Sequence, residues 1–174
     1  MPTRRVLAVL AAAAMLTAAC SGSDDSGLDP LPTASTDADG FTAEEREVVE
    51  AVDAYQSALI EYQKGDRDID LAEVATDEVA DGIVGGVEQA LDGEGLVMVG
   101  EYTLTPSSVS VTNDAAEYTG CLDNSRLLLV PEEDRDSPGV GSRPVGESTE
   151  VTYQLTRSSD TWLVSEPAGG DTPC

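Results

Sequence analysis

The sequence contains no histidine and only one lysine, Lys64. Without histidine, Ser-His-Asp and Cys-His catalytic arrangements and histidine-ligated zinc sites are excluded. Neither the G-x-S-x-G nucleophile pattern nor the G-x-x-x-x-G-K-[ST] phosphate-binding loop occurs. Aromatic residues make up only 4% of the chain, so the core is expected to be mainly aliphatic. Composition therefore argues against the enzyme classes that depend on these motifs, and it indicates no cofactor.

Basic residues are scarce throughout, with 9 Lys and Arg against 34 Asp and Glu and a net charge of −25. Such a surface repels nucleic-acid phosphates and anionic lipid headgroups, which excludes both as electrostatic partners. Cationic ligands, basic proteins and divalent ions are permitted but not required. The simplest interpretation of the acids is a solvated surface that keeps the protein soluble.

The N-terminal residues have the organisation of an export signal. Arg4 and Arg5 give a basic start, residues 6–15 are apolar, and small residues then lead to Cys20. This order predicts a signal peptide over residues 1–19 rather than a membrane-spanning helix. The segment resembles a bacterial lipobox, although Thr17 stands where leucine is usual. The resemblance implies lipid attachment at Cys20 on the extracytoplasmic face of the cell membrane; ordinary secretion with cleavage at the same bond is the alternative.

Composition divides the remainder into a tether and a domain. Residues 20–40 are rich in Ser, Gly, Asp, Pro and Thr, and they carry too little apolar surface to offset the entropy of ordering. We expect this segment to be flexible. Residues 41–174 are long enough for one domain with its own core. Removal of residues 1–19 would leave 7 basic residues and a formal charge of −27.

The chain has three cysteines, which leaves one unpaired in an oxidising compartment. If Cys20 is lipidated, Cys121 and Cys174 remain, and export favours a disulfide between them. Such a bridge would tie the last residue to the middle of the domain. Two free thiols are the alternative.

Two helical regions are expected at the start of the domain. Thr42 and Glu45 form a capping box, and an apolar stripe at helical spacing then runs to about Lys64, where Gly65 ends the helix. The members of this stripe are Val48, Val52, Tyr55, Leu59 and Tyr62. Asp70 caps a second region, 71–91. Its glycines at positions 82, 85 and 86 predict a break into two short helices.

From Leu96 onward the apolar period changes to alternation, which predicts antiparallel strands. The first strand is expected to close at Pro106. The following strand segments are 109–111, 116–122, 127–130, 151–155 and 162–164. Turns are expected at 113–114 and 158–160, and a long loop over 131–146. Helices followed by an antiparallel meander predict an α+β fold with the helices packed on one face of the sheet.

Three segments give the domain a family resemblance: 95–100, 115–125 and 161–164, read as GLVMVG, AAEYTGCLDNS and TWLV. In their order after the helices, they resemble small actinobacterial lipoproteins with a nuclear-transport-factor-2-like (cystatin-like) cone domain over residues 41–174. The resemblance implies a curved antiparallel sheet under N-terminal helices. It assigns no activity, because the group largely lacks a biochemical function.

Two groups of residues are candidates for chemistry, a set of carboxylates and a set of tyrosines. Alternate carboxylates from Asp66 to Asp70, with Asp77 in the twelfth place, are similar to a calcium loop, but Leu71 occupies the place where the turn needs glycine. A polar loop is the preferred interpretation, and no metal site is predicted. Isomerase-like members of the cone fold pair a carboxylate base with a tyrosine hydroxyl. The candidate hydroxyls are Tyr55, Tyr62, Tyr102, Tyr118 and Tyr153, but no spacing selects an acid, and we expect these rings to be core residues with hydroxyls at the rim.

Two functions follow as hypotheses. The first is a non-catalytic cell-envelope module that binds a partner protein or a hydrophobic small molecule at the open end of the cone. The second is an isomerase-like or dehydratase-like enzyme using a carboxylate and a tyrosine. An open pocket with a buried acid facing a tyrosine would favour the enzyme, and a filled cone would leave partner binding. A structural spacer is a third possibility.

Overall fold

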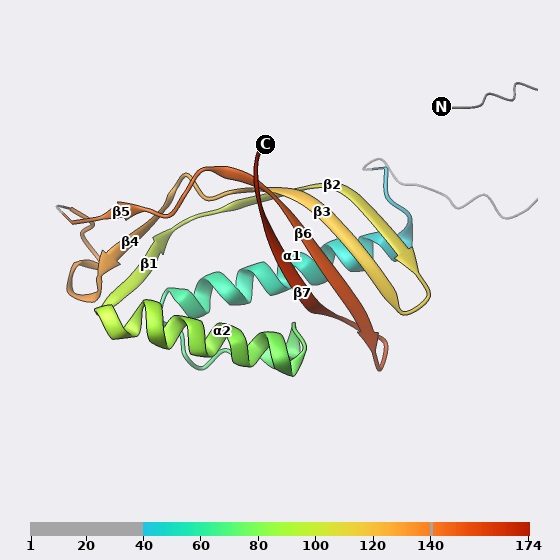
Figure 1. Cartoon of the computed structure of the whole chain (residues 1–174), viewed down its shortest axis with the longest axis horizontal. Coiled ribbons are helices and arrows are strands. Elements are labelled where there is room, and N and C mark those ends of the chain that lie inside the picture. Colours follow the sequence, from blue (N-terminus) through green and yellow to red (C-terminus); the bar gives the residue numbers. More distant parts are fainter. Residues whose placement is uncertain (1–39, 140) are drawn as a thin grey trace, which may run out of the picture. The chain divides into compact units, whose positions relative to one another are not determined.

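The computed structural model describes residues 40–139 and 141–174. Two helices lie on one side of a curved antiparallel sheet (Figure 1). The predicted α+β fold class is therefore confirmed. The expected signal peptide, the lipid site Cys20 and the expected tether, apart from Gly40, lie outside the described residues.

Helix α1 (Ala43–Gln63) begins and ends where the sequence predicts. Thr42 Oγ1 accepts a hydrogen bond from the Glu45 amide at 3.3 Å, and Glu45 Oε2 accepts one from the Thr42 amide at 2.8 Å. At the other end, Gly65 takes the left-handed conformation, with φ of +100°. The predicted capping box and glycine stop are both confirmed.

The second helical region breaks at a different place from the one predicted. A short 3-10 turn covers Leu71–Glu73, and α2 (Asp77–Ala90) then runs unbroken through its three glycines. The break lies at 74–76, where the backbone pairs with Val164 of the last strand. The Thr76 amide donates to the Val164 carbonyl at 2.9 Å, and the Val164 amide donates to the Val74 carbonyl at 3.1 Å. Tertiary pairing, rather than the low helix propensity of glycine, decides the boundary.

Seven strands form two sheets. The larger sheet has the order β2-β3-β6-β7 and the smaller has the order β1-β4-β5, with all pairs antiparallel. The strands are β1 (Leu96–Gly100), β2 (Thr103–Thr112), β3 (Ala115–Asp123), β4 (Leu127–Pro131), β5 (Arg143–Pro144), β6 (Ser148–Ser158) and β7 (Thr161–Pro173). The expected loop 131–146 holds the short strand β5 and a 3-10 turn, Glu132–Asp134.

The prediction of one strand from Leu96 to Pro106 was wrong. The segment forms two strands instead of one, and Pro106 does not end the second. The chain bends after Gly100, whose φ is +104° and whose missing Cβ would lie 2.1 Å from the Arg126 carbonyl oxygen. This bend separates β1 from β2 and sends them into different sheets. Pro106 lies inside β2 at a register shift. It is tolerated there because β2 is an edge strand of its sheet.

Both predicted turns connect adjacent strands. Asn113 has φ of +55° between β2 and β3, and Ser159 and Asp160 have φ of +49° and +70° between β6 and β7. Positive φ at both central residues of the second turn matches the right-handed twist of a two-residue hairpin. The two hairpins hold all four strands of the larger sheet next to their sequence neighbours, and β3 pairs with β6 between them.

The main core fills the space between α1 and the concave side of the larger sheet. Its largest members are Tyr55, Tyr118, Tyr153, Leu155 and Trp162, with Val48, Val52 and Val164. A second cluster lies between the end of α1 and α2, and it contains Tyr62, Leu71, Val87 and Leu91. A third cluster, made of Ile60, Met98 and Leu127, lies where the smaller sheet begins.

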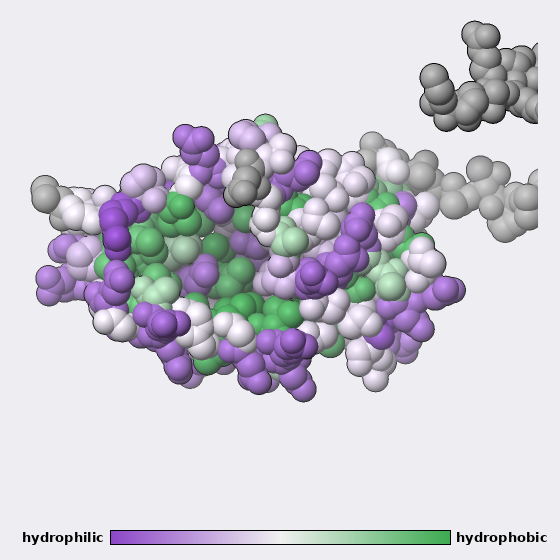
Figure 2. All heavy atoms as spheres, viewed as in Figure 1, coloured by the Kyte–Doolittle hydropathy of each residue, from purple (hydrophilic) through white to green (hydrophobic). Residues whose placement is uncertain are grey.

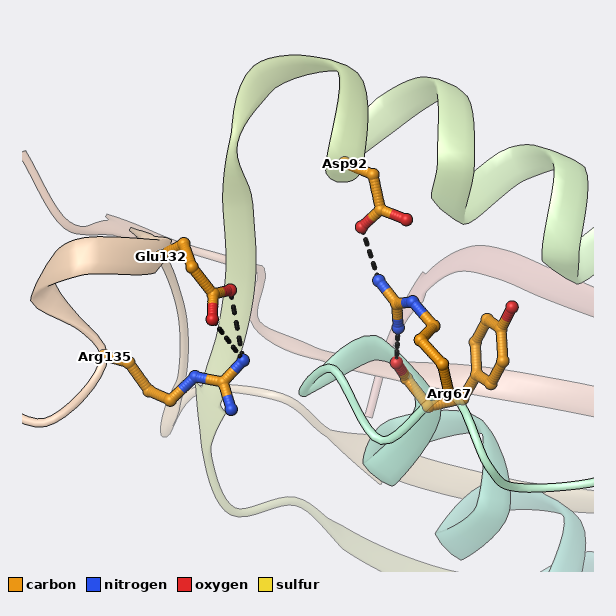
Figure 3. Close-up of polar contacts among 5 residues, drawn as sticks. Arg67, Asp92, Glu132 and Arg135 are labelled. Atoms are coloured by element: carbon orange, nitrogen blue, oxygen red, sulfur yellow. Dashed lines mark hydrogen bonds and ion pairs between the residues drawn. The ribbon is translucent and has the colours of Figure 1, made fainter.

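An arginine fastens the loop after α1 to the end of α2 (Figure 3). Arg67 donates to the Tyr62 carbonyl and to Asp92 Oδ1, and its guanidinium lies 4.7 Å from the centre of the Tyr62 ring. Nearby, Arg135 donates to both carboxylate oxygens of Glu132, at 2.8 and 3.1 Å. The contacts of Arg67 tie the end of α1 to the turn that follows α2, and the Arg135–Glu132 pair stabilises the turn after β4.

Candidate functional site

Two adjoining hollows open at the end of the cone, with volumes of about 440 and 250 Å³. They share five lining residues: Tyr55, Leu59, Gln63, Met98 and Pro167. We call the pair the apolar cleft. Figure 2 shows hydrophobic side chains gathered on this face of the molecule, over the region between β1, α2 and β7. Hollows of this size fall in or near the range of small-molecule binding sites.

Each wall of the apolar cleft comes from a different element. Helix α1 contributes Tyr55 and Leu59, α2 contributes Ile83 and Val87, and β1 contributes Met98. Residues of the larger sheet, including Leu122 and Val151, line the smaller hollow. The cleft exists because the bend at Gly100 turns β1 away from β2, so that side chains of the smaller sheet face those of the larger one across open space.

The rim contains the C-terminal half of β7. Pro167, Ala168 and Gly169 line the smaller hollow. Beyond them the pairing with β6 shifts register, from Val151 opposite Gly169 to Thr149 opposite Pro173. A disulfide joins Cys121 to Cys174, with 5.9 Å between their Cα atoms. The structure thus pairs the two cysteines that the sequence favours, and the bridge holds the end of the rim strand against β3.

The polar groups of the apolar cleft form a small buried network. The Tyr153 hydroxyl donates to Gln56 Oε1 at 3.0 Å, and Gln56 is only 2% exposed. The Tyr55 ring meets the Tyr153 ring edge-on, with centroids 5.6 Å apart. Burial raises the pKa of Tyr55 to about 12 and also raises the pKa of Tyr153. Both phenols therefore stay neutral at ordinary pH and act as packing and orienting groups.

No charged residue is among the described residues that line the apolar cleft, although a quarter of the chain is charged. A proton-transfer mechanism needs an acid or base within hydrogen-bond reach of the substrate. The tyrosines of the cleft lack a carboxylate partner there. The arrangement suits binding of apolar groups.

An acid with a raised pKa does lie near other tyrosines, outside the cleft. Burial, followed by the charge of Glu50, raises the pKa of Asp53 on α1. The Asp53 charge in turn contributes to the raised pKa values of Tyr102 and Tyr118, in which burial is the larger cause. The Tyr118 side chain is fully buried in the core, and its hydroxyl has no hydrogen-bond partner among the described residues. Asp53 itself is an exposed residue of α1 and lines neither hollow of the apolar cleft.

The expectation that tyrosine hydroxyls lie at the rim was wrong for two of the five. The hydroxyls of Tyr118 and Tyr153 are buried inside the core. Only Tyr55 and Tyr153 line the apolar cleft, whereas Tyr62 packs between the helices under Arg67. The structure does not bring the five candidate tyrosines together.

The acidic segment that is similar to a calcium loop is an ordinary polar turn. Asp66 Oδ1 accepts a hydrogen bond from the Asp68 amide at 3.2 Å, and Asp70 Oδ1 accepts one from the Ala72 amide at 3.0 Å. The expected cap at Asp70 is thus confirmed. Within residues 40–139 and 141–174, no group of three acids or cysteines is arranged to hold a metal ion.

Sequence reasoning missed Met98 and Gln56, which hold central places in the apolar cleft. A signal for Gln56 was present: Val48, Val52 and Ile60 flank it at intervals of four on the buried side of α1. A polar residue in such a stripe needs an internal partner. The role of Met98 depends on the separation of β1 from β2, and no local pattern indicated that separation.

Solved structures with similar chain paths include the intermembrane space region of chloroplast protein ARC6. It has a TM-score of 0.54 and 19% identity, over 72% of this chain and 95% of that chain. The two share a fold. An NTF-2-like protein of unknown function from Shewanella oneidensis MR-1 aligns at a TM-score of 0.46 and 15% identity, over 72% and 98% of the two chains. A protein of unknown function with a cystatin-like fold, from Nostoc punctiforme PCC 73102, gives 0.41 and 16%, over 76% and 96%.

No family model and no curated protein matches the sequence. No helix in the described part of the chain is long and apolar enough to cross a membrane.

Proposed function

We propose that this protein is a non-catalytic binding module of the cell envelope, and that its apolar cleft takes a hydrophobic small molecule. The observation that carries the proposal is the cleft itself: two adjoining hollows of about 440 and 250 Å³ with no charged group in the lining. Apolar ligand surface that is buried there would contribute about 25 cal/mol of binding free energy for each Å² removed from water. A cell-envelope partner protein that inserts an apolar side chain is the second candidate occupant.

The enzyme alternative is not favoured, because it needs a carboxylate facing a tyrosine hydroxyl. Tyr55 and Tyr153 lie in the cleft, but Asp53, the carboxylate whose charge acts on tyrosines, is exposed and lines neither hollow. A ligand in the cleft would contact neutral phenols and aliphatic groups. Binding without chemical change is the function that these contacts support best.

Envelope placement is supported by two features. The disulfide between Cys121 and Cys174 suits an oxidising compartment. The export-type segment 1–19 and the cysteine at position 20 suit a lipid anchor on the extracytoplasmic face. If the anchor is present, Cys20→Ser moves the protein from the membrane fraction to the medium. Unchanged membrane retention of that variant would refute the anchor.

Binding at the apolar cleft is tested with N-phenyl-1-naphthylamine, an uncharged dye that fluoresces in apolar surroundings. We expect saturable binding to residues 20–174 and loss of binding in Leu59→Glu, because Leu59 lines both hollows and a buried charge there is costly. Gln89→Glu is the matched control, since it makes the same charge change at an exposed position of α2 outside the lining. Equal dye binding by the wild type and Leu59→Glu would refute the cleft as the binding site.

A further inference from the structure

The electrostatic setting of the apolar cleft restricts the ligands that it can accept. Residues 41–174 carry 29 acidic and 7 basic residues, a formal charge of −22, yet the lining of the cleft is neutral. An anionic head group entering such a site loses its hydration and finds no cation in the lining. It also approaches against the field of the whole domain. The lost hydration and the repulsion both disfavour the binding of an anionic ligand.

We infer that the apolar cleft selects uncharged single-chain aliphatic molecules and rejects anionic ones of the same chain length. This inference rests on the proposed function and specifies in addition that the ligand is uncharged. The polar groups in the lining are neutral, and they include the phenols of Tyr55 and Tyr153 and the amides of Gln63 and Asn124. Neutral groups of this kind hydrogen-bond a hydroxyl without requiring a counter-ion.

The neighbouring hollow that contains cations does not reverse this selection. Lys64 and Arg135 line a hollow of about 430 Å³, which meets the apolar cleft at Met98. Lys64 Nζ donates to Glu61 Oε1 at 2.8 Å, and Arg135 donates to Glu132 as described above. Glu61 and Asp66 also line this hollow, so its lining has no net charge. Both cations already have carboxylate partners, and an anionic head group would have to compete with them.

The selection can be changed by a cation in the lining. Gln63 lines both hollows and is half-buried at the end of α1. Gln63→Lys would therefore place an ammonium group beside a bound head group. Gln89→Lys makes the same charge change at an exposed position of α2 outside the lining. The two positions form a matched pair for adding a positive charge.

The test measures displacement of N-phenyl-1-naphthylamine from residues 20–174 by octan-1-ol and by octanoate. At about pH 8 the carboxylate is fully ionised. We expect octanol to bind about tenfold or more tightly than octanoate at low salt. Higher salt should narrow this difference without removing it, because screening weakens the field but not the cost of burying the charge. Gln63→Lys should raise the affinity for octanoate severalfold relative to octanol, whereas Gln89→Lys should have a much smaller effect on this ratio.

Each other outcome has a defined meaning. If octanoate binds as tightly as octanol or more tightly, charge selection is wrong while the proposed function stands. Loss of that octanoate binding in Lys64→Gln would then place an anionic head group on Lys64. If the dye binds but neither molecule displaces it, the selection is wrong while the proposed function stands. If the dye itself does not bind, the proposed function fails and the selection fails with it.

Discussion

The Tyr153 hydroxyl donates a hydrogen bond to Gln56 Oε1 at 3.0 Å, with both side chains buried between the larger sheet and α1. It joins residues 97 positions apart in the sequence. Because the pair lines the smaller hollow of the apolar cleft, it couples packing of the core to the shape of the site.

Removing the hydrogen-bond donor from this pair should destabilise the folded protein. Tyr153→Phe leaves Gln56 Oε1 buried without a donor, and we expect the free energy of unfolding to fall by about 1–3 kcal/mol. Urea denaturation monitored by circular dichroism measures this change. The double variant Tyr153→Phe with Gln56→Leu removes both polar groups and should lose less than Tyr153→Phe alone. A double variant that is less stable than the single one would contradict this account of the pair.

The bridge between Cys121 and Cys174 should contribute strongly to stability. It closes a loop of 53 residues, for which the chain-entropy model gives about 4 kcal/mol. We expect Cys121→Ser with Cys174→Ser to lower the urea midpoint accordingly, and a reductant to have the same effect on the wild type only. Equal midpoints for the oxidised wild type and the double variant would show that the bridge contributes nothing.

Asp53 should make stability depend on pH in a defined direction. Burial, with a smaller effect of Glu50, raises its folded-state pKa above the ordinary value of 3.8. Between those two pKa values the folded state binds more protons than the unfolded state, so this group makes stability fall as pH rises. Asp53→Asn should therefore be more stable than the wild type at neutral pH, and the difference should vanish below about pH 3.8. An Asn variant that is less stable at neutral pH would contradict the assignment.

Two glycines should respond oppositely to alanine. At Gly100 an added Cβ would meet the Arg126 carbonyl at 2.1 Å, and φ is +104°. Gly100→Ala should therefore cost at least about 2 kcal/mol. At Gly85, inside α2, an added Cβ meets nothing within 4 Å, and Gly85→Ala should stabilise by up to about 1 kcal/mol. Thermal unfolding of the two variants tests both values, and a destabilised Gly85→Ala would show that α2 needs its glycines.

Local signals predicted the elements whose boundaries are set locally. The capping box at Thr42, the glycine stop at Gly65 and the turn at Asn113 all depend on neighbours in the sequence, and all are confirmed. The break before α2 could not be predicted from its glycines, because backbone pairing with Val164, far along the chain, determines it. Likewise, the bend at Gly100 depends on close approach to Arg126 from another loop.

The candidate site was predictable only in outline. The sequence indicated a cone fold and a set of tyrosines without deciding whether the cone was open. The charge-free lining emerges only when two helices and five strands converge. Met98 illustrates this, because it reaches both hollows only after β1 has separated from β2. The disulfide was more accessible to sequence reasoning, since a count of cysteines and an expected lipid site left a single pair.

Met98 also provides the most direct measurement of the central claim, which is that the apolar cleft binds an uncharged aliphatic ligand. It is the only methionine in residues 20–174, so labelling methionine methyl groups with ¹³C should give a single side-chain signal from the wall of both hollows. We predict that octan-1-ol shifts this signal saturably and that Leu59→Glu abolishes the shift. A methyl signal that stays unmoved up to the solubility limit of octanol would contradict the account.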